Sequence, residues 1–425
     1  MHMDIKNSER GTALRVLENV LEGRAFSNIA LRKAFRANQH LGKKNRAFVS
    51  EIVYTTIRNL IQIDFIINHF TKIETCKMEP AIRNLLRLSV CQMRFMDKVP
   101  SYAAVNEAVE LARAVGHAGL SGFVNGVLRN VARNPKKPHI GSDDLGLLYS
   151  CPKELLDELQ ALGPGLEEFL KNCQTTPPVT VFPNTTIISL QELAKVLEGE
   201  EIETEALDSC LIVKGTGDIS MLDSFKSGLF FVMDPGAYHP VMALELKPGE
   251  TLVDLCAAPG GKSFAAACIM QNEGVIEAYD ISRHKVSLIV QGKRRLGLRI
   301  IGAAYGDALK YEPRREAYAD AVLVDAPCSG LGTLRKHPEI KYRFAKKDIK
   351  MHAEKQILLL KKAVRLLKPG GRLVYSTCTI TKQENMEVAI ELEKSSKISL
   401  LETFQIMPGK TTDGFFVAKF TKNLV

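Results

Sequence analysis

The second half of the chain alternates strand-like and helix-like patterns, and this regularity limits the folds open to it. Apolar strand patterns occur at residues 251–255, 274–279, 300–305, 321–325 and 371–376. Amphipathic helix patterns occur at residues 262–271, 282–296, 346–367 and 383–394. Strands separated by helices form a mostly parallel sheet with helices on both faces. We therefore predict a doubly wound α/β domain, closed at its end by a hairpin-connected pair of strands within residues 399–420.

A glycine-rich turn follows the first strand of that domain, in the stretch TLVDLCAAPGGKS at residues 251–263. Its small residues let a ligand approach the backbone, while the N–H groups of the next helix point at that ligand. Lys262 and Ser263 resemble the end of a P-loop, but the glycine required five residues before the second glycine is absent. The turn is therefore a candidate ligand loop without the signature of nucleoside triphosphate hydrolysis. An ordinary strand-to-helix turn is the alternative.

Three aspartates occur where later strands end: Asp280, Asp307 and Asp325. The carboxyl ends of parallel strands share one edge of a sheet, which is where open α/β sheets bind ligands. Three carboxylates at that edge suit a cationic sulfonium cofactor with a ribose and an adenine better than a polyphosphate. Any one of them can instead cap a helix, and for Asp280, just before ISRHKV, that alternative is equally good.

Two cysteines follow strands on the same edge, Cys328 in DAPCSGLG and Cys378 in VYSTCTI. The C5 carbon of a pyrimidine is a poor nucleophile, so a thiolate must first add to C6 before C5 can accept a methyl group. Asp325 can stabilise the charge that develops on the base. A nearby basic side chain would lower the pKa of the thiol, the candidates being Arg335, Lys336 and His337. The base would have to leave its stack or belong to an open RNA segment.

The first part of the chain has a different pattern. Apolar residues recur at helical spacing from Ser8 to Asn134, which predicts an all-helical bundle of about seven helices. No acidic residue lies between Gly23 and Ser50, where the basic residues are Arg24, Arg32, Lys33, Arg36, Lys43, Lys44 and Arg46. Residues 1–150 carry a net charge of +9, residues 151–210 of −9 and residues 211–425 of +9. Basic surfaces attract polyanions, so nucleic acid is the leading partner class. A basic face that only keeps the bundle soluble is the alternative.

Between these parts we predict a linker and a small α+β unit. Residues 134–144 are rich in proline, glycine and charge, and a helical segment follows at 152–162. Short β-type runs then occur at residues 178–184, 186–190, 210–215 and 228–234, around one helix at 190–197. The expected domains are a helical domain at 1–140, a linker and small α+β domain at 141–235, and the α/β domain at 236–425.

Several classes of protein are disfavoured. No run approaches the roughly 18 apolar residues of a membrane span, and the N-terminus lacks the apolar core of a signal peptide. We therefore expect a cytoplasmic protein with no membrane partner. The nine cysteines are scattered and never in C-x-x-C spacing, so neither a disulfide framework nor a bound metal is expected. We expect a monomer.

The motifs DLCAAPGGKS, DAPCSGLGTLRKHPEIKYR, YSTCTITKQEN and DGFFVAKF together resemble the Nop/Sun family of S-adenosylmethionine-dependent RNA cytosine-5 methyltransferases. The stretches VNEAVELA and FVNGVLRN resemble the helical NusB-type RNA-binding domain, as found in the bacterial 16S rRNA branch of that family. The resemblance implies a NusB-like helical domain, a Rossmann-like class I methyltransferase domain, S-adenosyl-L-methionine as cofactor, and rRNA of the small subunit as partner.

The resemblance also implies roles for single residues. Cys378 would be the nucleophile, and Cys328 would assist release of the methylated product. Asp280 would bind the ribose, Asp307 would lie by the adenine, and Asp325 would serve both the cofactor pocket and the target base. The residues that would wrap the cofactor are Cys256, Ala257, Ala258, Pro259, Gly260, Gly261 and Lys262. Two alternatives stay open: a DNA cytosine-5 methyltransferase, in which the P-C cysteine attacks, and a non-catalytic RNA-binding ribosome-assembly factor.

Overall fold

The computed structural model describes residues 5–97, 99–115, 118–136, 138–310 and 316–424. Contacts within the chain divide it into two compact units. The first unit consists of Met1–Gln174 and Leu334–Phe344, and the second of Thr175–Thr333 and Ala345–Val425. The expected division into three domains, with boundaries at 140 and 235, stays a prediction.

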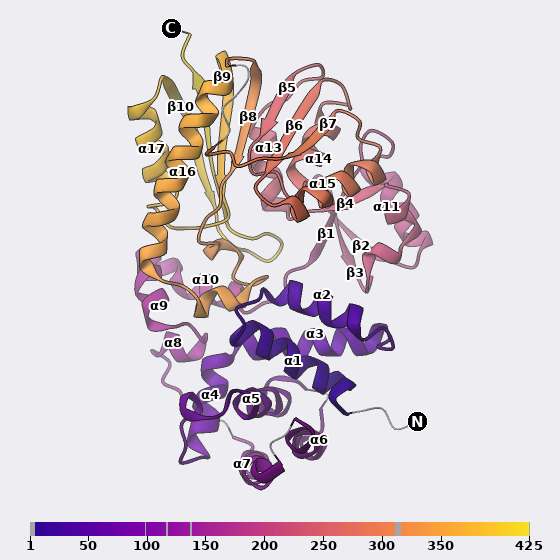
Figure 1. Cartoon of the computed structure of the whole chain (residues 1–425), viewed down its shortest axis with the longest axis vertical. Coiled ribbons are helices and arrows are strands. Elements are labelled where there is room, and N and C mark those ends of the chain that lie inside the picture. The colour runs from indigo at the N-terminus through magenta and orange to yellow at the C-terminus, as the bar shows by residue number, and fades with distance from the viewer. Residues whose placement is uncertain (1–4, 98, 116–117, 137, 311–315, 425) are drawn as a thin grey trace. The chain divides into compact units, whose positions relative to one another are not determined.

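The first unit is helical, as the apolar spacing predicted (Figure 1). Its helices in the described part of residues 5–134 are α1 (Glu9–Leu21), α2 (Ser27–Ala37), α3 (Lys43–Arg58), α4 (Leu60–His69), α5 (Pro80–Phe95), α6 (Ser101–Ala114) and α7 (Ser121–Arg133). Three shorter helices follow, α8 (Leu145–Leu148), α9 (Lys153–Leu159) and α10 (Leu166–Cys173). α9 confirms the helical segment expected at 152–162. The apolar faces of the first seven helices form one core, with side chains such as Ile63, Leu85 and Leu128 fully buried.

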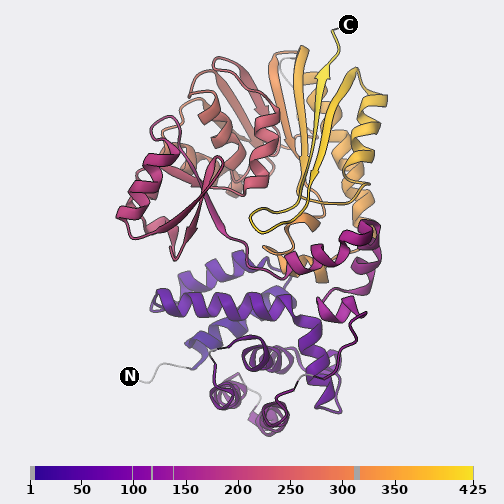
Figure 2. The same ribbon diagram turned by 180° about the vertical axis from the view of Figure 1, so that it is seen from behind.

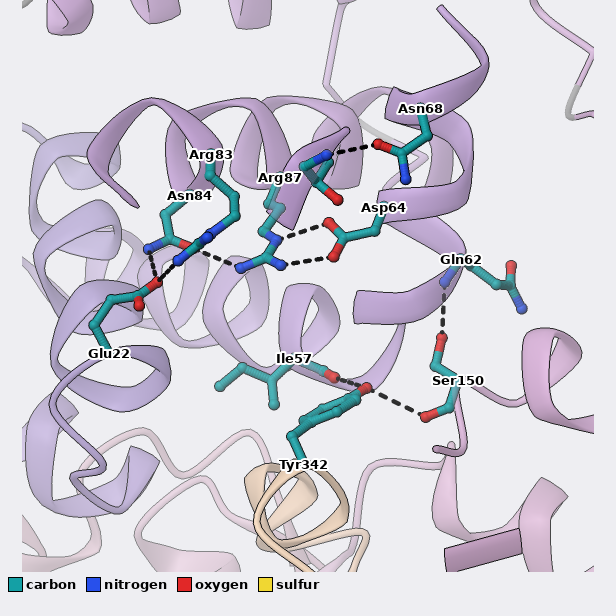
Figure 3. Close-up of polar contacts among 11 residues, drawn as sticks. Glu22, Ile57, Gln62, Asp64, Asn68, Arg83, Asn84, Arg87, Ser150 and Tyr342 are labelled. Carbon is teal, nitrogen blue, oxygen red and sulfur yellow. Dashed lines mark hydrogen bonds and ion pairs between the residues drawn. The ribbon is translucent and has the colours of Figure 1, made fainter. Parts of the chain in front are cut away.

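Ion pairs connect the helices of this unit (Figure 3). Arg87 on α5 donates two hydrogen bonds to the carboxylate of Asp64 on α4, at 2.7 and 2.6 Å. Arg83 and Asn84 on α5 both donate to Glu22, just after α1. Because a charged group loses its hydration on burial, the buried Arg87 depends on the carboxylate of Asp64.

The segment Leu334–Phe344 belongs to the helical unit by its contacts, although it lies far along the sequence. The hydroxyl of Tyr342 lies 2.8 Å from the carbonyl oxygen of Ile57 and 3.3 Å from that of Ser150 (Figure 3). Glu339, which is 1 % exposed, accepts hydrogen bonds from the N–H and hydroxyl of Ser27. Lys341 donates to the carbonyls of Arg58 and Tyr149, and burial lowers the pKa of its ammonium group to about 8. This segment therefore completes the interior of the helical unit.

The second unit contains a seven-stranded sheet in the order β10-β11-β9-β8-β5-β6-β7. Its strands are β5 (Thr251–Asp254), β6 (Val275–Asp280), β7 (Ile301–Tyr305), β8 (Ala319–Asp325), β9 (Leu367–Thr377), β10 (Ile398–Ile406) and β11 (Phe415–Lys422). Strands β5 to β9 pair in parallel, whereas β11 runs antiparallel to both β9 and β10. The predicted doubly wound sheet and the terminal strand pair that closes it are confirmed.

Helices cover both faces of this sheet (Figure 1). On one face lie α13 (His239–Ala243), α14 (Gly261–Ile269) and α15 (Arg283–Leu296), whose apolar side chains pack against inward residues such as Leu252 and Leu323. On the other face lie α16 (Lys346–Leu366) and α17 (Met386–Ser395), which pack against the alternate residues Val253 and Val322. Because successive strand residues point to opposite faces, strands buried on both sides are apolar throughout. Among the described helices, none has both the length and the apolar composition that crossing a membrane requires.

A second, four-stranded antiparallel sheet, ordered β2-β3-β1-β4, carries α11 (Leu190–Gly199) (Figure 2). Its strands are β1 (Val179–Pro183), β2 (Glu203–Leu207), β3 (Cys210–Lys214) and β4 (Phe230–Val232). The strand expected at 186–190 is wrong. The N–H groups of Ile187 and Ile188 both donate to the carbonyl of Asn184, forming a turn, and Ser189 caps α11. The fourth strand is instead β2, an edge strand with polar, exposed residues and hence no apolar pattern.

Candidate active site

Four carboxylates lie at the carboxyl edge of the large sheet. β5 pairs with β8 on one side and with β6 on the other, so Asp254, Asp325 and Asp280 end neighbouring parallel strands. The N–H of Gly306 donates to the carbonyl of Asp280 at 3.1 Å, which brings the next residue, Asp307, beside it. The structure thus brings together at one edge the three aspartates selected from the sequence. Asp254 is a fourth carboxylate at this edge, which the sequence analysis did not select. Burial raises the pKa of its carboxyl to about 7.

The alternative function of Asp280 as a helix cap is wrong. Ser282 caps α15, because its side chain accepts the N–H of Lys285. Asp280 instead accepts the N–H of Ser282 through one carboxylate oxygen and the N–H of Ala258 through the other, at 2.8 and 3.3 Å. Its carboxylate therefore connects the end of β6 to the glycine-rich loop.

The glycine-rich loop lies against the end of β6. Ala257 donates its N–H to the carbonyl of Tyr279 at 2.9 Å. Gly260 has a φ of +112°, and a Cβ there would lie 2.5 Å from the ring of Phe264. Both observations require glycine at this position, since L-residues avoid this backbone region. The turn into α14 therefore packs closely against Phe264 at a position that carries no side chain.

Lys262, at the start of α14, forms an ion pair with Asp325. Its Nζ lies 2.6 Å from Oδ2 of Asp325, and Ser376 on β9 donates to Oδ1 at 2.8 Å. Burial lowers the pKa of Lys262, but the charge of Asp325 and its hydrogen bond outweigh this effect and leave the pKa raised, with a further upward contribution from Cys378. The Asp325 carboxylate is thus held in one orientation, with its cation beside the thiols.

Cys328 and Cys378 face each other across the loops that follow β8 and β9. Their sulfur atoms are 3.4 Å apart, and both residues are half-buried. The pKa of the Cys328 thiol lies well above its ordinary value, because the contact with Cys378 and burial both favour the neutral form. Asp325 and Ser376 are register partners on the two strands, which explains why thiols two or three residues further on meet.

Glu384 connects the loop that carries Cys328 to the loop that carries Cys378. It was not among the site residues predicted from the sequence. It is fully buried and accepts hydrogen bonds from the N–H and hydroxyl of Ser329, at 2.8 and 2.5 Å, and from the hydroxyl of Thr381 at 2.9 Å. The Ser329 hydroxyl also lies 2.7 Å from that of Thr379, so the residues that follow the two cysteines are in contact. The sequence feature that could have indicated this role is the acidic residue in the motif YSTCTITKQEN, six positions after Cys378.

We expect Glu384→Ala to lower the free energy of unfolding by about 2–3 kcal/mol, because buried donors lose their acceptor. Methyl transfer should fall as well, since the loop carrying Cys328 is no longer fixed. Chemical denaturation and methyl-transfer assays measure the two effects. Glu391→Ala, at an exposed acid of α17, is the matched control and should unfold within about 0.5 kcal/mol of the unchanged protein. Equal stability of the two variants would contradict the proposed role of Glu384.

The three basic residues that the sequence suggested as lowering the pKa of the thiol belong to the helical unit by their contacts. Arg335, Lys336 and His337 belong to the segment that packs with the helical unit. Arg335 is 1 % exposed, and His337 Nδ1 lies 3.7 Å from the carboxylate of Glu339. Within the second unit, Lys262 is a cation that does interact with Cys378. The described residues contain no cluster of His, Cys, Asp or Glu suited to a metal ion.

The sheet order, the glycine-rich loop and the acidic edge define a Rossmann-like methyltransferase domain, joined to an all-helical domain. Residues 241–421 match the 16S rRNA methyltransferase RsmB/F family, and residues 7–133 match the NusB family. The chain belongs to the RsmB/F family of methyltransferases, as the motif resemblance implied.

Similar proteins span the whole chain. The probable ribosomal RNA small subunit methyltransferase B of Bacillus subtilis (strain 168) is 36 % identical, over 98 % of this chain and 99 % of that protein. The corresponding Synechocystis protein is 34 % identical, over 90 % of this chain and 88 % of its own length. The crystal structure of PH0851 superposes with a TM-score of 0.85 at 27 % identity, covering 99 % of this chain and 100 % of that one.

Proposed function

We propose that this protein transfers a methyl group from S-adenosyl-L-methionine to C5 of a cytosine in RNA, and that the RNA is 16S rRNA. Membership of the RsmB/F family supports rRNA methylation. The observation that carries the choice of C5 is the pair of thiols 3.4 Å apart beside the Lys262–Asp325 ion pair. Methylation of an exocyclic nitrogen needs no thiol, because that atom already has a lone pair.

The residues at the sheet edge fit S-adenosyl-L-methionine. Asp280 accepts the N–H of Ala258, which holds the glycine-rich loop at the end of β6 where such a ligand would lie. Asp280 and Asp307 offer carboxylates for ribose hydroxyls and the adenine side, and an acidic edge favours a sulfonium cation. When bound, this cofactor supplies an electrophilic methyl group. Cys256 to Lys262 would hold it against the start of α14.

The two thiols have different expected roles. The Cys378 thiolate adds to C6 of the cytosine, which makes C5 electron-rich enough to accept the methyl group. Asp325, held by Lys262 and Ser376, orients the polar edge of the base by accepting a hydrogen bond from its amino group, and a proton delivered to N3 on that edge neutralises the negative charge that the addition places on the ring. A base then takes the C5 proton, the electron pair of that C–H bond re-forms the C5–C6 double bond, and Cys378 leaves as a thiolate. Cys328, in contact with Cys378, is placed to assist this second step.

The helical unit is the proposed RNA-binding surface. Of the basic residues between Gly23 and Ser50, Arg46 is half-buried and stacks on Phe35, while the others are exposed. The exposed set is Arg24, Arg32, Lys33, Arg36, Lys43 and Lys44. Arg32 and Arg36 are four residues apart on α2 and hence on one face of it. Backbone phosphates are the natural partners of such a face.

We expect the double variant Arg32→Ala/Arg36→Ala to weaken RNA binding about ten-fold at moderate salt, and to lower the slope of log affinity against log salt by about 1 to 2. Filter binding over a salt series measures both. Lys394→Ala/Lys397→Ala, which removes one exposed lysine in the last turn of α17 and another just after that helix, is the matched control. If both double variants bound RNA equally well, the α2 surface would not be the RNA-binding one.

Nucleoside analysis tests the proposed function directly. The purified protein is incubated with methyl-labelled S-adenosyl-L-methionine and, side by side, with 16S rRNA or duplex DNA. Label in 5-methylcytidine from the rRNA is the expected result. Label in DNA would instead support a DNA cytosine-5 methyltransferase, and label in another nucleoside would exclude C5 chemistry. An inactive protein that still restored ribosome assembly in a strain lacking it would support a non-catalytic assembly factor.

A further inference from the structure

Besides its proposed part in methyl transfer, the thiol pair has the geometry of a site for oxidation. We propose that Cys328 and Cys378 form a reversible intramolecular disulfide when a hydroperoxide reacts with the site, and that this bond stops methyl transfer. Formation of the disulfide follows from the structure alone, whereas the loss of activity rests on the proposed function.

The two sulfur atoms need only a small movement to bond. They are 3.4 Å apart, and a disulfide bond is about 2.05 Å long. Both residues stand in loops directly after paired strands, so a rotation of each side chain is enough to change this distance. Both are half-buried rather than enclosed, which leaves an approach for a small oxidant.

The backbones of the two loops are held together independently of the thiols. Gly332 donates its N–H to the carbonyl oxygen of Cys378 at 2.9 Å. A Cβ at position 332 would lie 2.9 Å from that oxygen and 2.3 Å from the carbonyl oxygen of Gly414, so only glycine permits this approach. Ser329 and Thr379 are in contact as well, and buried Glu384 fixes Ser329. A thiol held this close has a high effective concentration towards its neighbour.

The chemistry balances with hydrogen peroxide as the oxidant. The Cys378 thiolate attacks one peroxide oxygen, the O–O bond breaks, and hydroxide leaves, giving a sulfenic acid on Cys378. The Cys328 thiol then attacks that sulfur, forms the S–S bond and expels the sulfenic oxygen as water. The hydroxide takes up the proton that Cys378 released when it became a thiolate. Two thiols are thereby oxidised and one peroxide is reduced to two molecules of water. A dithiol reductant reverses the reaction by thiol–disulfide exchange.

Four buried cysteines elsewhere in the chain are poorly suited to this reaction. Cys91, Cys151, Cys210 and Cys268 are buried, and burial raises the pKa of each thiol, to about 12 for Cys91 and about 11 for the other three. Thiolates are the reactive form, so these four should resist oxidation. Cys76 is exposed and would confuse an assay by joining two chains. Cys76→Ser, which lies in the helical unit and is no part of the proposed machinery, is therefore the background for the test.

The test uses the full-length Cys76→Ser protein treated with a small excess of hydrogen peroxide, alkylated, and digested with trypsin without reduction. We expect a linked pair of peptides, residues 316–335 and 373–382, which contain Cys328 and Cys378. Its yield should rise in step with the loss of methyl transfer, and dithiothreitol should restore at least about nine-tenths of the activity. Without peroxide both peptides should be alkylated.

Two results would overturn the proposal. One is inactivation with Cys378 found as sulfinic acid and Cys328 still free. The other is a linked peptide whose formation leaves methyl transfer unchanged. The linked peptide is detected without any turnover, so the oxidation test and the test of cytosine methylation can fail separately.

Discussion

Cys378→Ala should lose methyl transfer by a factor on the order of 10⁴ or more, because without a thiolate C5 has no means of becoming nucleophilic. The residue is half-buried, and its thiol contributes one sulfur contact and packing at the edge of the core. The variant should therefore fold, and RNA binding should change by less than about two-fold, since affinity comes largely from phosphate contacts.

The measurement compares incorporation of labelled methyl groups into 16S rRNA by the two proteins, with thermal unfolding as the check on folding. Cys76→Ala, which replaces an exposed thiol of the helical unit, is the matched control and should retain full activity. Normal turnover by Cys378→Ala would remove the nucleophile from the proposed mechanism and with it the assignment of C5.

Cys328→Ala should instead accumulate a covalent protein–RNA complex. Addition of Cys378 and methylation do not require the second thiol, but loss of the C5 proton and release of Cys378 do in the proposed scheme. The complex should resist denaturing gel electrophoresis and contain the transferred methyl group. The double variant Cys328→Ala/Cys378→Ala should form none, which separates a true adduct from tight binding. Rapid release of methylated RNA by the single variant would show that Cys328 does not assist the second step.

The sequence predicted the parts of this site that depend on strand ends. Asp280, Asp325, Cys328 and Cys378 each follow a recognisable apolar strand, and parallel pairing necessarily brings such positions to one edge. The helical part was equally predictable, since its apolar spacing extends over many turns.

Contacts between distant side chains were not predictable. Lys262 pairs with Asp325 across 63 positions, and nothing in either motif alone indicates this. Glu384 fell within the helix expected at 383–394 as one more polar residue, because its partners Ser329 and Gln356 are far away in sequence. The strand expected at 186–190 failed because its isoleucines occupy a turn, where local hydrogen bonds to Asn184 override β propensity.

The segment Leu334–Phe344 determines when, during synthesis, the helical unit can complete its interior. A ribosome makes the chain from its N-terminus, so α1 to α10 emerge while Glu339, Lys341 and Tyr342 have not yet been made. Until then Ser27 lacks its carboxylate acceptor, and the carbonyl of Arg58 lacks its lysine donor. The N-terminal unit thus cannot finish folding by itself as it leaves the ribosome. It acquires its last interior residues only after β5 to β8 of the large sheet have been translated.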